Sequence, residues 1–436
     1  MLVTDENRAD FLEWLGERHP IVAFDTECDG YHWNDPMRLV QFGDSQRGWA
    51  LPVDTQRDFI AEVLKRMETH CEPTDFVAHN LKFDTHKLVQ SGFKAEWLLD
   101  AHDTALMAHA FNPAGSHKLK VLGEEILGVS ADPEAALKKS FKGTGRQEFY
   151  TALRADGLAV KEARVEAAVR SEASKLSWAT VPIDNPLYVM YAVNDVLLTA
   201  GIFEYFQLVM RPEDVEVYEF ELRVQKVLYA MEQKGLLIDE PYTLALKAKW
   251  GDEEQFLGEQ IEAAKHEVWG DFYKAGRSSP GSTDQLAETL QLCGWKPKAR
   301  TKTNKVQLDK SVLEDLAVDY PLARTFQEYK RRAKWTSAYL DHFLDERDAA
   351  GRVHASINGA RARTGRMSIT DPALQTLPSH DPLVRGCIIP PSGSALLAVD
   401  YSQIEMLILA SFAGEETMME ARREGLDLHT ATAQLV

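Results

Sequence analysis

The sequence predicts an α/β protein that begins with a mixed sheet covered by helices and continues into a helical region and a final α+β region. Short apolar runs bounded by Gly, Asp and Asn predict strands at residues 21–24, 39–42, 49–53 and 76–79. Segments with helical periodicity follow at residues 97–111, 118–127 and 187–210. Because strands and helices alternate, the first half of the chain is expected to fold around one sheet.

Proline divides this half from the next. Pro212 interrupts the helix that precedes it, and a second helical region is expected over residues 213–345. A charged, Ala-rich stretch at residues 132–180 has the composition of a helical insertion. The predicted domains are residues 1–210, 211–350 and 351–436.

The last domain returns to strand and turn patterns from Val353 onward. Residues 395–399 are predicted to form a strand, and a helix is expected from Ser402. Ser402 and Glu405 have the spacing of a capping box at the start of that helix.

Composition is typical of a globular protein of the cytoplasm. The chain of 436 residues is 44% hydrophobic and 27% charged. It has no apolar run of about 18 residues and no signal-peptide pattern in residues 1–10, so we expect no membrane association. The cysteines are scattered and form no C-x-x-C pair, which favours reduced thiols over disulfides or a zinc site: Cys28, Cys71, Cys293 and Cys387.

The net charge of −18 argues against nucleic acid, because binding to phosphates usually needs a basic surface. Residues 1–210 alone hold 21 basic and 32 acidic groups. Such an excess is compatible with nucleic acid if carboxylates hold divalent metals that face the phosphate. Simple solubility would explain the charge equally well.

Three acidic motifs have a spacing that could bring them to one site. Asp25 and Glu27 follow an apolar strand and, being two residues apart, can share one face of it. Asp84 comes after the next buried-type strand, where a helix begins. Tyr191 and Asp195 are four apart in a periodic helix and project from one face.

Each motif alone has an ordinary structural explanation. Asp-x-Glu is common in turns, Asp84 could simply stabilise the first turn of a helix, and Tyr191 could be a core tyrosine beside a solvated acid. Together, the four carboxylates and the phenol match what two hard divalent cations need. Mg²⁺ and Mn²⁺ prefer oxygen ligands, and two such ions can hydrolyse a phosphodiester.

These motifs resemble the tyrosine-bearing subclass of the DEDD exonucleases, in order and in spacing. The resemblance implies two divalent ions, Mg²⁺ or Mn²⁺, and four metal ligands, Asp25, Glu27, Asp84 and Asp195. It implies that Tyr191 orients the attacking water and that Asn80 helps to hold the 3′ end of single-stranded DNA. Asp103 lies in a similar context and is interpreted as structural.

The second half resembles family A DNA polymerases, which include bacterial DNA polymerase I and its phage relatives. The resemblance rests on three strings, Arg363 to Ser368, Pro372 to Pro378 and Asp400 to Glu405. It implies a ribonuclease H-like proofreading domain, a helical thumb and a partial palm. The basic segments 296–305 and 324–334 fit a thumb that grips phosphates.

Within the palm, the resemblance implies that Asp400 binds a metal for nucleotidyl transfer and that Glu405 excludes a ribose 2′-OH. Arg366 and Gln375 would contact the minor groove of a primer-template. Two residues depart from the family pattern and leave ordinary nucleotide handling in doubt: Leu407 stands where the family carries Arg, and Ala373 where it carries Asn.

The family continues into a fingers region and a second metal-binding aspartate, and neither pattern is present before Val436. We therefore expect a 3′→5′ proofreading exonuclease attached to an incomplete polymerase that does not extend a primer by itself. An alternative is a DNA-binding subunit that completes a split polymerase with a second polypeptide. An RNA-trimming exonuclease is disfavoured, because those proteins lack the polymerase strings.

Overall fold

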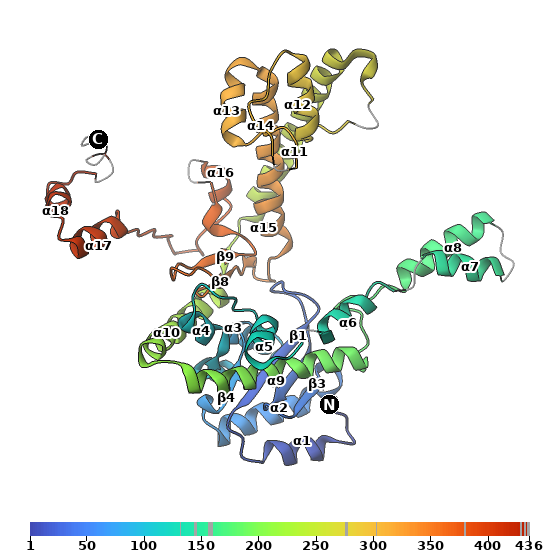
Figure 1. Ribbon diagram of the computed structural model, residues 1–436, viewed down its shortest axis with the longest axis vertical. Coiled ribbons are helices and arrows are strands. Elements are labelled where there is room, and N and C mark those ends of the chain that lie inside the picture. Colours follow the sequence, from blue (N-terminus) through green and yellow to red (C-terminus); the bar gives the residue numbers. More distant parts are fainter. Residues whose placement is uncertain are drawn as a thin grey trace. The chain divides into compact units, whose positions relative to one another are not determined.

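The computed structural model describes residues 1–130, 132–143, 146–155, 160–274, 278–301, 303–378, 381–427, 430 and 433 (Figure 1). The chain divides into two compact units, residues 1–388 and residues 389–436.

A five-stranded mixed sheet organises the first unit, in the order β3-β2-β1-β4-β5. Its strands are β1 Val22–Cys28, β2 Met37–Gly43, β3 Gly48–Pro52, β4 Phe76–Ala78 and β5 His102–Asp103. β1, β2 and β3 pair antiparallel, whereas β1 pairs parallel with β4, and β4 with β5. The predicted mixed sheet is confirmed. Strand β1 extends through the acidic motif, so Asp25 and Glu27 lie inside the strand rather than after it.

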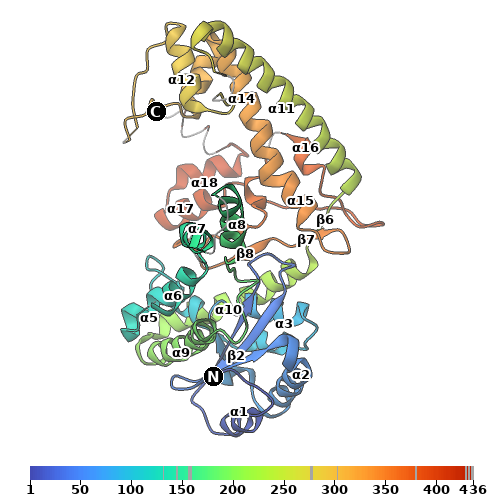
Figure 2. The same ribbon diagram turned by 90° about the vertical axis from the view of Figure 1, so that its right-hand side faces the viewer.

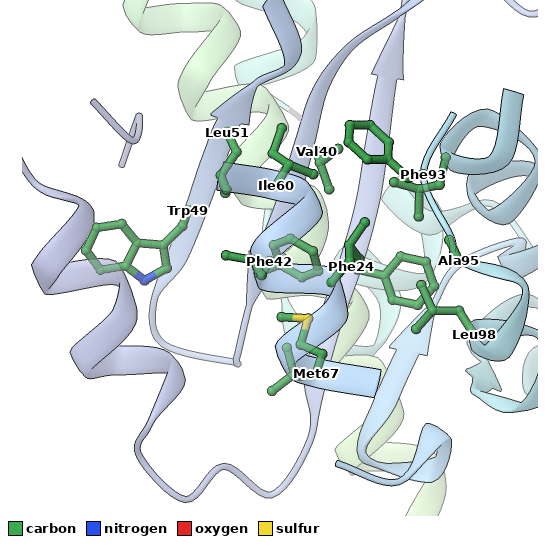
Figure 3. Packing of buried hydrophobic residues seen from close by; sticks show 14 of the residues in the cluster. Phe24, Val40, Phe42, Trp49, Leu51, Ile60, Met67, Phe93, Ala95 and Leu98 are labelled. Atoms are coloured by element: carbon green, nitrogen blue, oxygen red, sulfur yellow. The ribbon is translucent and has the colours of Figure 1, made fainter. Parts of the chain in front are cut away.

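Side chains of β1 alternate between two cores, as the period of a strand requires. Phe24 points into a core shared with helices α1 Arg8–Leu15, α2 Val53–His70 and α3 Leu81–Gln90. Figure 3 shows Phe24 beside Val40, Phe42 and Met67 in this core. Ala23 points to the opposite core. Asp25 and Glu27 have the same parity as Ala23 and so face that second side.

Helix α9, Pro186–Val209, covers the second face of the sheet and contacts β1, β2 and β3. It can approach closely because Gly43 and Gly48 lack side chains. A Cβ on Gly43 would lie 2.7 Å from Val196, and one on Gly48 would lie 2.8 Å from Val193. The same face is covered by α4 Thr104–Phe111 and α5 Leu119–Leu127.

By length and composition alone, α9 is apolar enough to cross a membrane, and it is the one such helix among the described residues. Its apolar character is explained by its place in the core, because 56% of the relevant window is buried against the rest of the unit. The helix is not an uninterrupted apolar run, because it contains Asn194, Asp195 and Glu204.

The predicted segment 97–111 is not one helix. It contains a 3₁₀ turn, η2 Glu96–Asp100, then strand β5, and only then α4. The helix begins late because Asp103 is its N-cap and accepts hydrogen bonds from the backbone N–H groups of Ala105 and Leu106. Pairing with β4 holds the preceding residues extended.

Three helices lie within the predicted insertion, whose last described residues, 174–180, are turn or coil. Its helices are α6 Asp132–Ser140, α7 Arg146–Ala155 and α8 Val160–Ala173. α6 packs against α9, and α7 and α8 lie side by side as a helical hairpin (Figure 1). Residues 144, 145 and 156–159 of the insertion lie outside the described residues.

The expected second helical region is present. Its elements are α10 Pro212–Lys234, α11 Glu240–Trp269, α12 Thr283–Leu292, α13 Lys310–Asp319, α14 Pro321–Trp335, the π-helical turn η5 Thr336–Leu340 and α15 Asp341–Asp345. α11 and α14 run side by side in both views (Figures 1 and 2). Ile261 of α11 and Phe326 of α14 are buried in one hydrophobic cluster. Short strands and one helix complete the unit: β6 Leu236–Leu237, β7 Arg352–Val353, β8 Ser356–Asn358, β9 Ser368–Thr370 and α16 Pro382–Arg385.

Helix α10 follows the predicted boundary at Pro212 but packs on the sheet domain. The Tyr218 hydroxyl lies 2.9 Å from a ring nitrogen of His102, and Gln225 donates to Asp103 over 3.0 Å. Compact units and family domains need not coincide, so the domain limits near residues 210 and 350 stay predictions.

The second unit contains α17 Ile404–Ala413 and α18 Glu416–Arg423. Two expectations are wrong here. Residues 395–399 form no strand, because no strand among the described residues pairs with them, and Leu397 is 87% exposed. The capping box at Ser402 is also absent, because the helix begins at Ile404 with Gln403 as its N-cap.

Candidate active site

Carboxylates from a strand and a helix meet on the α9 side of the sheet. Oxygen atoms of Asp25, Glu27 and Asp195 all lie within 4.8 Å of one another. The first two project from β1 and the third from the middle of α9, which the glycines of β2 and β3 allow to lie close. Glu27 and Asp195 are buried, and Asp25 is partly buried.

Asp84 joins this group from the first turn of α3. Its Oδ1 accepts hydrogen bonds from the backbone N–H and the hydroxyl of Thr26, over 3.0 and 2.7 Å. These bonds attach α3 to the centre of β1, between the two carboxylates of the strand. Asp84 is 2% exposed. The carboxylates predicted from the sequence are therefore neighbours around one site.

Burial and mutual repulsion make this cluster costly to ionise without cations. Burial raises the pKa of Asp25 to about 7, although the Lys120 ammonium opposes the rise. Burial, and next the charge of Asp25, raise the pKa values of Glu27 and Asp84 well above their usual range. Clustered carboxylate oxygens of this kind are the donors that hard divalent ions prefer, so the residues present fit such ions.

Tyr191 lies one helical turn before Asp195. Burial raises the pKa of its phenol, so the hydroxyl keeps its proton and can donate a hydrogen bond. The ring packs beside Trp178, with centroids 5.3 Å apart. Its position next to the carboxylates is the one expected from the sequence.

Lys120, which the sequence analysis missed, lies among these groups. Its ammonium contacts Asp195 Oδ1 and lies 4.5 Å from the centroid of the Tyr191 ring. Burial lowers the pKa of Lys120 to about 8, against the pull of Asp25 and Glu27. A signal existed in the sequence, because a lysine in the first turn of a helix opposes the helix dipole.

The carboxylates lie in a cavity of about 990 Å³ whose walls mix acidic and apolar groups. Tyr31, Phe83 and Trp178 line it near the carboxylates, and Phe220 of α10 and Met367 line it as well. Trp178 belongs to the predicted insertion. The insertion is therefore part of the site wall, which its composition did not indicate.

Asn80 also lines this cavity and has a left-handed backbone, with φ of 72°. Asp103 holds that conformation, because its carboxylate accepts hydrogen bonds from the backbone N–H groups of Asn80 and Leu81 over 3.1 and 2.9 Å. These contacts fit the structural interpretation of Asp103 and leave the Asn80 side chain at the cavity.

The residues expected to serve the polymerase belong to two different parts of the chain. Gln375 is fixed to the β9 end of the β8–β9 hairpin, with its amide donating to the Met367 carbonyl over 2.9 Å and accepting from the Ile369 N–H over 3.2 Å. Arg366 lies in the same hairpin. Asp400 and Glu405 belong to the second compact unit and are exposed.

Comparison with known families accounts for most of the chain. Residues 2–211 match the family described as 3′-5′ exonuclease, and residues 249–436 match DNA polymerase family A. The chain belongs to the family A DNA polymerases, which act in DNA replication, and carries a 3′-5′ exonuclease domain.

Phage polymerases are among its similar relatives. The chain is 31% identical to the DNA polymerase of Mycobacterium phage L5 over 99% of its own length and 68% of that protein. It is 28% identical to the DNA polymerase of Mycobacterium phage D29 over 98% of its length and 67% of that protein. The chain thus spans about two thirds of these relatives.

A solved structure shares the fold. The POL domain of Pol1 from M. smegmatis, in complex with DNA primer-template and dNTP, matches 98% of this chain and 65% of its own, with a TM-score of 0.62 and 21% identity. This likeness supports the ribonuclease H-like fold of the exonuclease domain, whose sheet carries the carboxylate cluster.

Proposed function

We propose that this chain is a 3′→5′ proofreading exonuclease that hydrolyses the terminal phosphodiester of a DNA strand with two divalent ions, Mg²⁺ or Mn²⁺. The observation that carries the proposal is the meeting of Asp25, Glu27 and Asp195 within 4.8 Å, inside a domain that matches the 3′-5′ exonuclease family. When bound, such ions would activate water and stabilise the leaving 3′ oxygen.

The residues of the chain divide this work among them. Asp25, Glu27, Asp84 and Asp195 would hold the ions. The protonated Tyr191 hydroxyl would orient the water that attacks the phosphorus, and Asn80 would hold the 3′-terminal nucleotide at the cavity. The apolar and aromatic walls would exclude bulk water, which strengthens every charge interaction inside.

DNA is the proposed substrate because the relatives are DNA polymerases and because the similar solved structure is a complex with DNA primer-template. A single-stranded 3′ end would enter the cavity, whose volume of about 990 Å³ has room for a terminal nucleotide. The relatives belong to bacteria and to phages of bacteria, which supports action in the cytoplasm, of a host cell if the chain is phage-encoded.

The test is degradation of 5′-labelled single-stranded DNA by the purified chain with Mg²⁺ or Mn²⁺. We expect shortening from the 3′ end and release of 5′-mononucleotides. Asp25→Ala/Glu27→Ala should remove this activity, since two proposed metal ligands are lost. A double variant as active as the wild type would refute the assignment.

For the polymerase half, we propose that Asp400 binds a metal and that Glu405 selects against ribose, as the family resemblance implies. Arg366 and Gln375 would meet a primer-template, with Gln375 already fixed to the β8–β9 hairpin by two hydrogen bonds. We assign these roles to the domain predicted at residues 351–436, after an exonuclease domain at 1–210 and a thumb-like region at 211–350.

A further inference from the structure

One ammonium lies inside the carboxylate cluster. Lys120 Nζ contacts Asp195 Oδ1, and the two side chains are only 17% and 8% exposed. The same ammonium lies over the Tyr191 ring, 4.5 Å from its centroid, and its field reaches Asp25 and Glu27. A single positive charge is thus shared by several acidic groups that would otherwise repel one another.

Neither helix stability nor solvation explains this position. Lys120 is the second residue of α5, where the helix dipole disfavours a cation. Lysine is rarely buried without a partner, because its ammonium loses hydration. The neighbouring Lys118, the N-cap of the same helix, remains exposed. The carboxylates are therefore what holds Lys120 at this place.

We propose that Lys120 is a positioning residue that acts as the resident counter-ion of the carboxylate cluster, partly neutralising it before divalent cations bind and releasing Asp195 when they do. This inference rests on the exonuclease function proposed above. An oxygen of Asp195 cannot at once pair closely with an ammonium and serve fully as a ligand of a divalent ion. Metal binding must therefore include the cost of separating the two groups.

The charges also fit a role once the metals are in place. Four carboxylates balance two divalent ions, so the ammonium of Lys120 would leave the loaded site with one surplus positive charge. A phosphodiester carries one negative charge. Lys120 would thus lower the repulsion in the metal-free site and favour the anionic substrate in the loaded one.

This role predicts effects of opposite sign, which a merely structural lysine would not produce. Loss of the ammonium should destabilise the metal-free protein, because the carboxylates lose the cation that contacts Asp195 and that opposes the rise in the pKa of Asp25. It should also tighten metal binding, because divalent ions no longer compete with Lys120. If Lys120 were needed only for packing, its removal would lower both the stability of the metal-free protein and its affinity for metal.

The experiment compares Lys120→Met and Lys120→Arg with the wild-type chain, using Lys118→Met as the control. Lys118 lines the same cavity, so its loss changes the same local charge without removing the Asp195 contact. Melting temperature is measured in EDTA, and Mn²⁺ binding is measured by titration calorimetry and electron paramagnetic resonance. Lys120→Met should melt lower in EDTA and bind Mn²⁺ about tenfold more tightly, whereas Lys120→Arg and Lys118→Met should stay close to wild type.

The possible outcomes distinguish failure of the counter-ion role of Lys120 from failure of the proposed exonuclease function. Unchanged or weaker Mn²⁺ binding in Lys120→Met overturns the counter-ion role while leaving the exonuclease proposal intact. Equal tightening in Lys120→Met and Lys120→Arg also overturns it, because the charge would then not be the cause. If the Asp25→Asn variant binds Mn²⁺ as tightly as the wild-type chain, the metal does not bind at the carboxylate cluster, and the proposed function itself is refuted.

Discussion

Two acidic motifs of this chain follow similar apolar runs in the sequence but have opposite structural fates. Asp25 follows residues 21–24, and Asp400 follows residues 395–399. In the first compact unit, β1 is paired on both sides, and Phe24 is fully buried. In the second unit, the corresponding run is exposed and pairs with no strand among the described residues.

The difference shows that a strand-like sequence pattern is not sufficient for a strand. Such a segment forms a strand only where neighbouring strands pair with it. β1 meets this requirement with β2 and β4, and its alternate side chains then have a core on each face. The site depends on the same pairing, because only a strand covered by α9 can present carboxylates to Asp195. Asp400 is exposed, and no strand among the described residues pairs with the run before it.

The largest expected contrast lies in the apolar runs themselves. Phe24→Ala should destabilise the first unit by about 3 to 5 kcal/mol, because it leaves a cavity in a packed core. Leu397→Ala should change stability by less than ~0.5 kcal/mol, since Leu397 is 87% exposed. Chemical denaturation followed by circular dichroism measures both. Similar losses in the two variants would mean that residues 395–399 are buried in solution.

A buried carboxylate that is not among the proposed metal ligands extends the comparison of buried with exposed positions. Glu232 is 4% exposed and accepts from Lys82, from the Ile357 N–H, and from His86 over 2.7 Å. Glu232→Ala should cost about 3 to 5 kcal/mol in the free energy of unfolding, because the Lys82 ammonium would be left unpaired. The exposed Glu216 on the same helix is the control, and Glu216→Ala should have little effect. A loss below ~1 kcal/mol for Glu232→Ala would show that water reaches Lys82.

Activity should distinguish the carboxylates of the site from other acids of the same unit. Asp195→Ala should slow release of nucleotides from single-stranded DNA more than about 100-fold, because a proposed metal ligand is lost. Asp58, exposed on α2 at the opposite face of the sheet, provides the matched control. Asp58→Ala should keep the wild-type rate. A rate loss in both variants would point to a general effect of charge.

Much of this site could be predicted because its residues are tied to local patterns. Spacing two apart on a strand placed Asp25 and Glu27 on one face, and spacing four apart placed Tyr191 above Asp195. Spacing did not indicate Lys120 or Trp178, although the unfavourable place of a lysine in a first helical turn marked Lys120 as unusual. They reach the cavity from α5 and from the end of the insertion, and only tertiary packing brings those segments to β1 and α9.

The predictions for the end of the chain were wrong for a related physical reason. Residues 395–399 have strand composition, but pairing is a non-local property that composition does not contain. Helix α17 likewise begins at Ile404 because Gln403 adopts a left-handed backbone, with φ of 55°, which the Ser402–Glu405 spacing does not reveal. The early strand β5 was missed because two residues are too few to show a period.

Binding of metal should stabilise the first unit measurably. Millimolar Mn²⁺ should raise the melting temperature of the wild-type chain, because ions relieve repulsion among carboxylates only in the folded state. The rise should be smaller in Asp84→Ala, which lacks one proposed ligand. Differential scanning fluorimetry with matched EDTA samples measures both shifts. Equal shifts in the two proteins would place the bound ion somewhere else.

The smallest effect on activity is expected for Tyr191→Phe. The ring would keep its packing against Trp178 and its contact with the Lys120 ammonium, and all four carboxylates would remain. Only the hydroxyl proposed to orient water is lost, so the rate should fall about tenfold, the worth of one hydrogen bond, which is less than in Asp195→Ala. Single-turnover cleavage with Mn²⁺ at saturating DNA isolates the chemical step, and Mn²⁺ binding should stay unchanged. A loss as large as that of Asp195→Ala, with normal metal binding, would make Tyr191 essential to the chemistry rather than a residue that orients water.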